Sequence, residues 1–212
     1  MEILQQLAQS LQGGKTTDVA ELTQAALDQG LEPRVILDDG LIAGMAVVGE
    51  KFKAHEIFLP HVLLAAKAMY AGLDLLKPLL EGGEVPTRGR VVIGTVQGDI
   101  HDIGKNLVSI MLKGAGFEVI DLGKDVPPAR FVDAAVEADA AVIGLSTLLT
   151  TTMPVMQEVI RLAKERGIYG KVRIIVGGAP LSADYARQIG ADAYCFDGMS
   201  AVESVKEFLA AK

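Results

Sequence analysis

The residues Val91-Val-Ile-Gly-Thr-Val-Gln-Gly-Asp-Ile-His-Asp-Ile-Gly-Lys-Asn-Leu-Val108 decide the fold of this chain of 212 residues. The apolar, mostly β-branched run over 91–96 predicts a buried strand, and the apolar spacing from Ile103 onward predicts a helix. The polar turn that joins them contains Gly98, Asp99, His101 and Gly104. In open α/β sheets, ligands bind at the carboxyl ends of the strands, which is where this turn lies. The turn is therefore the first candidate for a functional site.

Strand and helix patterns alternate from this segment to the C-terminus. The predicted strands cover 90–96, 118–122, 140–145, 172–176 and 192–195. The predicted helices cover 103–115, 128–138, 154–167, 182–189 and 199–211. Continuous apolar runs such as 140–145 are typical of strands covered on both faces. Five strand–helix units predict an α/β fold with a doubly wound, flavodoxin-like (Rossmann-like) parallel five-stranded sheet in the order 2-1-3-4-5.

Residues 1–80 show helical spacing and almost no strand pattern. One helix is expected to start at Pro33 and continue through Val48, and a long one is expected from about Leu59 to Leu80. Around four helices with short connections predict a small antiparallel bundle. The segment 81–89 contains Gly, Pro and charged residues without periodicity, which is typical of a linker. We therefore expect a helical domain at 1–80, a linker at 81–89 and an α/β domain at 90–212.

The composition argues against several classes of partner. The formal charge of −7 and the pI near 5.0 are unsuited to nucleic-acid binding, which needs clustered Lys and Arg. Cys195 is the single cysteine, so we expect no internal disulfide and a reducing, cytoplasmic location. The N-terminal residues lack the pattern of a signal peptide. No stretch reaches the roughly 18 apolar residues of a membrane helix, so no membrane partner is expected.

Polar and small residues follow the other predicted strands as well. The third strand is followed by Ser146-Thr-Leu-Leu-Thr-Thr-Thr152, the fourth by Gly177-Gly-Ala-Pro180 and the fifth by Phe196-Asp-Gly-Met199. Glycines let another group approach the backbone closely. These segments therefore predict a polar slot beside Asp99 and His101.

Three interpretations of the first turn compete. His101 is as readily a structural histidine beside a helix-capping aspartate as a functional residue. A metal site built from Asp99, His101 and Asp102 is disfavoured, because metals in proteins usually have three or four protein ligands. A phosphate-accepting receiver shares the sheet order, but it needs an acidic residue after the third strand, where Ser146 and Thr147 stand.

Three motifs in order along the chain resemble those of one family. The segment Gly98-Asp-Ile-His-Asp-Ile-Gly104 resembles the Asp-x-His-x-x-Gly motif of cobalamin-binding proteins that hold the cofactor base-off/His-on. Ser146-Thr-Leu148 resembles their Ser-x-Leu signature, and Gly177-Gly178 their Gly-Gly pair. In the N-terminal half, 44–52 and 58–60 resemble the helical cap of methyl-carrying corrinoid proteins. The chain is thus similar to the cobalamin module of methionine synthase and to the small corrinoid proteins of methylamine, methanol, betaine and methoxyaromatic methyltransferase systems.

The resemblance implies a cobalamin or related corrinoid cofactor, such as methylcobalamin, with His101 as the cobalt ligand. Asp99 would accept a hydrogen bond from the other imidazole nitrogen, and Thr152 matches a hydroxyl that extends this relay in the family. Phe52 and Leu59 would cover the upper, methyl-bearing face of the cofactor, and Asp38 would touch its rim. Further cofactor contacts are implied for Gly98, Ile100, Asp102, Ile103, Gly104, Ser146, Leu148, Thr150, Gly177, Gly178, Asp197 and Gly198.

The family's chemistry implies a methyl carrier without catalytic residues of its own. Such a protein accepts a methyl group on Co(I) from a substrate-specific methyltransferase. It passes the group from methyl-Co(III) to a tetrahydrofolate or a thiol through an acceptor methyltransferase. A reductive activation protein is a third implied partner. The alternatives are a cobalamin-dependent sensor or regulator and, ranked below it, a radical mutase subunit.

Overall fold

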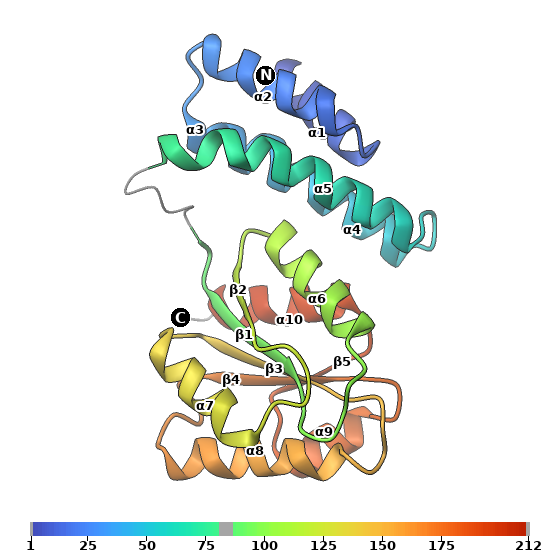
Figure 1. Ribbon diagram of the computed structural model, residues 1–212, viewed down its shortest axis with the longest axis vertical. Helices are drawn as coiled ribbons and strands as arrows, with labels where there is room; N and C mark the ends of the chain where they lie inside the picture. The colour runs from blue at the N-terminus through green and yellow to red at the C-terminus, as the bar shows by residue number, and fades with distance from the viewer. Residues whose placement is uncertain (1, 81–86, 211–212) are drawn as a thin grey trace. The chain divides into compact units, whose positions relative to one another are not determined.

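The structure is a computed structural model that describes residues 2–80 and 87–210 (Figure 1). The chain forms two compact units. One comprises Met1–Thr87 and Gly114–Gly116, and the other comprises Arg88–Lys113 and Phe117–Lys212. Residues 81–86 of the expected linker lie outside the described part of the chain.

The first unit is helical, as expected for residues 1–80. Its main helices are α1 (Glu2–Gln12), α2 (Thr16–Asp28), α4 (Ala43–Lys53) and α5 (Leu59–Leu76). Its short segments are α3 (Pro33–Val35), η1 (Ile36–Ile42) and η2 (Lys77–Leu79). Helix α2 packs along α5, and α1 packs against α2 and α4. Leu7, Leu11, Val19 and Ile36 are fully buried between these helices, so an aliphatic core stabilises the unit.

The helix that begins at Pro33 is not a regular α-helix along its whole length. It starts at Pro33 as expected, but Ile36–Ile42 is π-helical before the α-helical pattern resumes at Ala43. Gly40 lies in this segment, and a Cβ there would lie 2.6 Å from Cδ2 of Leu7. A π-turn takes one more residue than an α-turn, and such segments are rare. The chain is helical without a break from Pro33 to Lys53, as predicted, but apolar spacing over seven residues cannot distinguish the π-helical from the α-helical form.

Helix α5 and the short η2 that follows it form an apolar segment of membrane length. Leu59–Leu79 is long and apolar enough to cross a membrane by length and composition alone. Lys67 and Asp74 interrupt its apolar run, which is why the sequence shows no continuous stretch of about 18 apolar residues. Its buried face, which includes Val62, Ala65 and Met69, packs within the helical unit. Core helices of water-soluble proteins pass the same test, so the helix is weak evidence for a membrane.

The second unit is the predicted α/β fold. Strands β1 (Arg90–Thr95), β2 (Glu118–Asp121), β3 (Val142–Ser146), β4 (Arg173–Gly177) and β5 (Ala193–Cys195) form one parallel sheet in the order 2-1-3-4-5. The connecting helices are α6 (Ile103–Gly114), α7 (Pro128–Glu137), α8 (Met153–Glu165), α9 (Ala183–Ile189) and α10 (Gly198–Ala210). The predicted fold class and strand order are confirmed.

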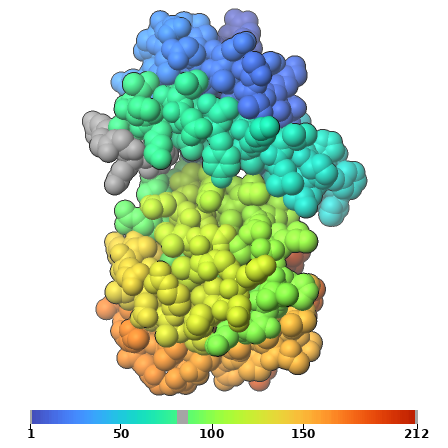
Figure 2. All heavy atoms as spheres, in the orientation of Figure 1, coloured from blue at the N-terminus to red at the C-terminus, as the bar shows by residue number. Residues whose placement is uncertain are grey.

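Helices cover both faces of this sheet. Helices α7 and α8 lie on one face, and α6 and α10 lie on the other (Figure 1). The larger core forms where α7, α8 and α9 meet the sheet, and it includes the fully buried Phe131, Ile143, Met156 and Ile174. In the space-filling view, residues of α6, β2 and the loop after β2 form the yellow-green surface that faces the viewer (Figure 2). Burial of the strands on both faces explains their continuous apolar runs.

Two strands extend one residue beyond their predicted ends. Ser146 is the last residue of β3 and pairs with both Thr95 and Gly177, and Gly177 is the last residue of β4. The prediction had placed Ser146 and Gly177 in the loops that follow. Both residues belong to the strands because they pair with neighbouring parallel strands. Serine and glycine have little intrinsic preference for strands, so the sequence alone did not indicate this.

Gly94 lets β1 pass close to the aromatic ring of Phe131. A Cβ at Gly94 would lie 2.7 Å from Cε1 and 2.9 Å from Cζ of that fully buried ring. We expect Gly94→Ala to lower the free energy of unfolding by about 1–3 kcal/mol, because a packed core yields little to an added methyl group. Urea denaturation followed by far-UV circular dichroism measures this. Gly104→Ala is the matched control, because a Cβ there meets no atom within 4 Å. Equal losses in the two variants would contradict the steric explanation.

Candidate functional site

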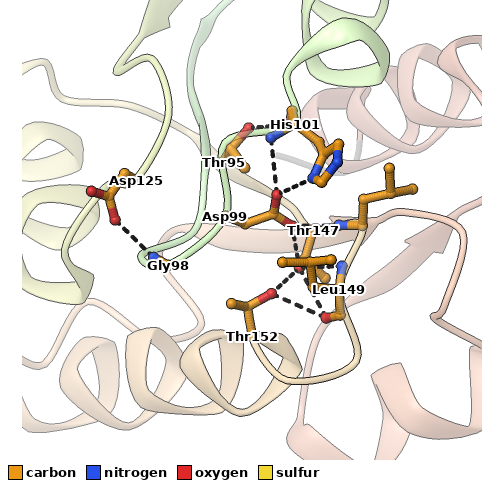
Figure 3. A network of polar contacts seen from close by, with 9 residues as sticks. Thr95, Gly98, Asp99, His101, Asp125, Thr147, Leu149 and Thr152 are labelled. Carbon is orange, nitrogen blue, oxygen red and sulfur yellow. Dashed lines mark hydrogen bonds and ion pairs between the residues drawn. The ribbon is translucent and has the colours of Figure 1, made fainter.

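The loop after β1 is folded by hydrogen bonds that lock a short turn. The amide of Asp99 donates to the carbonyl of Val96 at 3.1 Å. The hydroxyl of Thr95 donates to the carbonyl of His101 at 3.0 Å (Figure 3). Gly98 has a φ of +85°, a left-handed conformation that glycine adopts without strain. The loop therefore returns on itself and presents His101 just before α6.

Asp99 is the buried centre of this loop, and its carboxylate accepts four hydrogen bonds. Its side chain is 0% exposed. Oδ1 accepts from the amide and the Nδ1 of His101 at 2.9 and 2.7 Å. Oδ2 accepts from the amide of Leu148 at 2.6 Å and from the hydroxyl of Thr147 at 2.9 Å. Burial tends to raise the pKa of this carboxyl, but the four hydrogen bonds outweigh it and hold the pKa well below its usual range.

The charge on Asp99 determines how His101 carries its proton. An ionised carboxylate only accepts hydrogen bonds, so Nδ1 of His101 must be the donor in the 2.7 Å contact. In the neutral ring, Nε2 then carries a free lone pair. The side chain of His101 is 49% exposed, and Nε2 has no hydrogen-bond partner within the described residues. The site therefore presents one oriented imidazole nitrogen to its surroundings.

The hydroxyl groups of the loop after β3 complete the network. Thr147 Oγ1 lies 2.6 Å from Thr152 Oγ1, and Thr152 Oγ1 also lies within hydrogen-bond distance of the carbonyl oxygen of Leu149, at 3.0 Å (Figure 3). Thr152 has no contact with Asp99 among the hydrogen bonds of the described residues. Thr147 stands between them. The sequence prediction overlooked Thr147, although a second hydroxyl directly after Ser146 was a visible signal.

Asp125, in the loop between β2 and α7, supports the turn from a third strand end. Its Oδ1 accepts from the amide of Gly98 at 2.7 Å, and its own amide donates to the carbonyl of Asp99 at 3.0 Å (Figure 3). Asp125 has a φ of 55°, which is uncommon for residues other than glycine. No sequence motif indicated this residue, because its role depends on the pairing of β2 with β1.

Lys105 is a buried cation directly after the motif. It is 3% exposed, and its Nζ lies 2.7 and 2.5 Å from the two carboxylate oxygens of Asp121, at the end of β2. The Oδ1 of Asp121 also accepts from the amide of Gly123 at 2.9 Å. This ion pair ties the first turn of α6 to β2, and the sequence prediction missed it too.

The glycines of the motifs have different neighbours. A Cβ on Gly178 would lie 1.7 Å from the carbonyl oxygen of Thr147, and one on Gly177 would lie 3.0 Å from the carbonyl oxygen of Cys195. The chain's own backbone therefore requires the absence of a side chain at Gly178. At Gly104 a Cβ would meet no atom within 4 Å. The fold alone does not explain glycine at that position.

The other predicted residues of the α/β unit lie at the same edge of the sheet or at helix starts. Ile100, Ile103 and Leu148 are exposed apolar side chains at 66%, 76% and 46%. Thr150 is exposed, Asp102 and Ser146 are half-buried, and Gly198 is buried. Asp197 accepts from the amide of Ser200 at 2.7 Å and so caps α10. Exposed apolar side chains beside a polar site are typical of a surface that another molecule covers.

Three predicted residues belong to the helical unit. Phe52 is half-buried near the end of α4, and Leu59 is half-buried at the first position of α5. Asp38 lies in η1 and forms an ion pair with Arg34, with Oδ2 and Nε 3.6 Å apart. Within the helical unit these three residues form no site by themselves.

The side chains of this site fit a cofactor that itself supplies most of the ligands of its cobalt ion. The described residues contain no group of three or more His, Cys, Asp or Glu side chains that could hold a metal ion. The proposed site of Asp99, His101 and Asp102 also fails because both oxygens of Asp99 are engaged. A cofactor whose ring already holds the metal would need only one free imidazole nitrogen from the chain. His101 offers that nitrogen, and Gly104 leaves open space near it.

Comparison with known proteins identifies the family. Residues 89–206 match the family model of the B12 binding domain, and residues 3–77 match a second model with the same description. The chain therefore belongs to the B12-binding family, and it binds a cobalamin-type cofactor.

Curated relatives are named as corrinoid proteins. Dimethylamine corrinoid protein 1 of Methanosarcina acetivorans is 46% identical over 210 residues, covering 97% of this chain and 99% of that protein. Trimethylamine corrinoid protein 1 of Methanosarcina mazei is 46% identical over 192 residues, covering 90% and 89%. The methanol:cobalamin methyltransferase complex of Methanosarcina barkeri has a TM-score of 0.91 and 33% identity, covering 100% of this chain and 81% of that one. The predicted resemblance is confirmed, and a sensor is not favoured.

Asp125 provides a test of the support for the turn. We expect Asp125→Ala to lower the free energy of unfolding by about 1–3 kcal/mol, because Gly98 loses its acceptor and alanine tolerates a φ of 55° poorly. Asp125→Asn keeps an acceptor oxygen and the tolerance for this φ, so its loss should stay below about 1 kcal/mol. Urea denaturation and hydrogen exchange at the Gly98 amide measure both effects. A loss as large in the asparagine variant would show that the charge matters instead.

Cys195 is expected to be unreactive at neutral pH. Burial raises the pKa of its thiol to about 11; a hydrogen bond with Ser204 opposes this rise and the charge of Asp197 adds to it. Because only the thiolate reacts and the pKa is raised, alkylation should be slow at pH 8 and accelerate about tenfold per pH unit up to pH 10. Iodoacetamide labelling followed by mass spectrometry measures the rate on this single thiol. In urea the labelling should be fast. Rapid labelling of the folded protein at pH 7 would contradict the assignment.

Proposed function

We propose that this protein carries methyl groups on a corrinoid between methyltransferases, and that it serves methylamine metabolism. The observation that carries the proposal is the free Nε2 of His101. The ring is oriented by the hydrogen bond from its other nitrogen, Nδ1, to the buried carboxylate of Asp99. Membership of the B12-binding family and the corrinoid proteins among its relatives support it.

We assign His101 as the lower cobalt ligand, in the base-off/His-on mode. The cobalt of the bound corrinoid supplies the chemistry of methyl transfer. Asp99 holds the imidazole in the tautomer with the proton on Nδ1, which leaves the lone pair of Nε2 free to bind a metal. The exposed Ile100, Ile103 and Leu148 would bury their apolar surface against the cofactor.

We assign the slot residues to the displaced nucleotide tail of the corrinoid. The end of β3, the end of β4 and the start of α10 contribute Ser146, Leu148, Thr150, Gly177, Gly178, Asp197 and Gly198. These residues lie at the carboxyl ends of neighbouring parallel strands, where open α/β sheets bind ligands. Phe52 and Leu59 of the helical unit are proposed to shield the upper, methyl-bearing face from water, and Asp38 is proposed to touch the rim of the corrin.

The proposal implies more than one protein partner. A methyltransferase partner is supported by the methanol:cobalamin methyltransferase complex among the similar structures. We further propose an acceptor methyltransferase and a reductive activation protein. The free, buried Cys195 suits the reducing cytoplasm in which we place these partners.

His101→Ala tests the ligand and the function together. The protein, reconstituted with cobalamin, should show a visible spectrum that changes in His101→Ala, because the lower ligand is lost. Reduced and mixed with a methylamine methyltransferase and mono-, di- or trimethylamine, the wild-type protein should become methylated, and the variant more slowly. His55→Asn is the matched control, since His55 is an exposed histidine with a φ of 59° that asparagine tolerates. An unchanged spectrum in His101→Ala would refute the ligand, and no methylation with any amine would refute the carrier.

A further inference from the structure

We propose that Thr147, the middle residue of the Ser146-Thr147-Leu148 segment, positions the Asp99–His101 pair, and that Thr152 acts on that pair only through Thr147. The proposal rests on the proposed function, because it treats His101 as the ligand of the cofactor. It assigns a role in the relay to a position that the resemblance left without one.

The contacts of Thr147 carry the proposal. Its side chain lies between Asp99 and Thr152, 2.9 Å from Oδ2 of the aspartate and 2.6 Å from the hydroxyl of the second threonine (Figure 3). Thr147 is 1% exposed, so water does not compete for these contacts. Thr152 is 6% exposed and has no hydrogen bond to Asp99 among those of the described residues. The hydroxyl that touches the carboxylate is therefore that of Thr147.

The hydrogen atoms fix the direction of this chain of contacts. Each hydroxyl has one hydrogen to donate. Thr147 gives its hydrogen to Asp99, because a hydrogen bond to a carboxylate is stronger than one to the carbonyl of Leu149 at 3.3 Å. The 2.6 Å contact then needs a donor, so Thr152 gives its one hydrogen to the hydroxyl of Thr147 rather than to the carbonyl of Leu149, which lies farther away at 3.0 Å. Donation runs from Thr152 to Thr147 to Asp99, while His101 donates to Asp99 from the other side.

The backbone of Thr147 is held firmly, so its hydroxyl is well placed. Its amide donates to the carbonyl of Gly177 at 3.2 Å. Its carbonyl oxygen occupies the space that a Cβ on Gly178 would take. A side chain on such a rigid element orients its partner more accurately than one on a free loop. The Gly-Gly pair thus contributes to the position of His101 through Thr147.

Removal of the Thr147 hydroxyl should loosen one side of the carboxylate. In Thr147→Val, Oδ2 keeps only the amide of Leu148, while Oδ1 keeps both contacts with His101. Valine matches threonine in shape but offers no hydrogen bond. Asp99 is then oriented by three hydrogen bonds instead of four, and His101 is held less strictly in the tautomer with the proton on Nδ1.

The test compares Thr147→Val, Thr147→Ser and Thr152→Val, with two readouts. In the cofactor-free protein, ¹⁵N NMR of the imidazole of His101 reports its tautomer; the chain has only three histidines, and His55 and His61 are assigned by substitution. In the loaded protein, cobalamin titration measures the dissociation constant, and electron paramagnetic resonance of the Co(II) form reports nitrogen coupling from His101. Thr147→Ala is a second variant without the hydroxyl, in case Thr147→Val fails to fold.

We expect Thr147→Val to lower the Nδ1–H population, to weaken the nitrogen coupling and to raise the dissociation constant about tenfold. Thr147→Ser should restore all three, and Thr152→Val should change them less than Thr147→Val. An effect of Thr152→Val equal to or larger than that of Thr147→Val would overturn the proposal, as would a wild-type tautomer in Thr147→Val. Failure of the function itself is distinguishable, because ¹⁵N-labelled wild-type protein then shows no ¹⁵N coupling from its imidazole in the Co(II) form, while the tautomer readout still applies.

Discussion

The site depends on one buried carboxylate that is fully hydrogen-bonded. Asp99 is 0% exposed, and a buried charge is costly unless hydrogen bonds compensate it. Here two backbone amides, a threonine hydroxyl and an imidazole supply that compensation. Because all four groups donate, the carboxylate stays ionised and its partners have no freedom to reverse roles. The state of His101 follows from that constraint.

The order of the strands explains how these donors meet. Strands β1 and β3 are adjacent in the sheet although α6, β2 and α7 separate them in the chain. The loop after β1 carries Asp99 and His101, and the loop after β3 carries Thr147 and the amide of Leu148. Strand β2, on the other side of β1, leads to Asp125, which supports the same turn. The imidazole of His101 is thus held by residues from three strand ends rather than by its own loop alone.

The sequence predicted the elements of the fold better than the contacts within the site. Apolar, β-branched runs and regular alternation are local patterns, so the sheet and its order followed from them. The ends of β3 and β4 were missed by one residue, because ladder pairing across strands extended them. Thr147 and Asp125 could not be identified as partners of the turn, since their roles depend on distances between residues that are remote in the chain.

The glycines show why a motif does not by itself reveal the physical reason for a residue. Gly178 and Gly104 both belong to motifs of the family, yet only Gly178 is required by the packing of the chain itself. Its neighbour is the carbonyl of Thr147, so this glycine acts on the site by letting β3 and β4 approach. Gly104 faces open space, so the packing of the chain does not explain its lack of a side chain. Two glycines of the same kind of motif thus differ in whether the fold itself requires them, and only their three-dimensional neighbours distinguish the two cases.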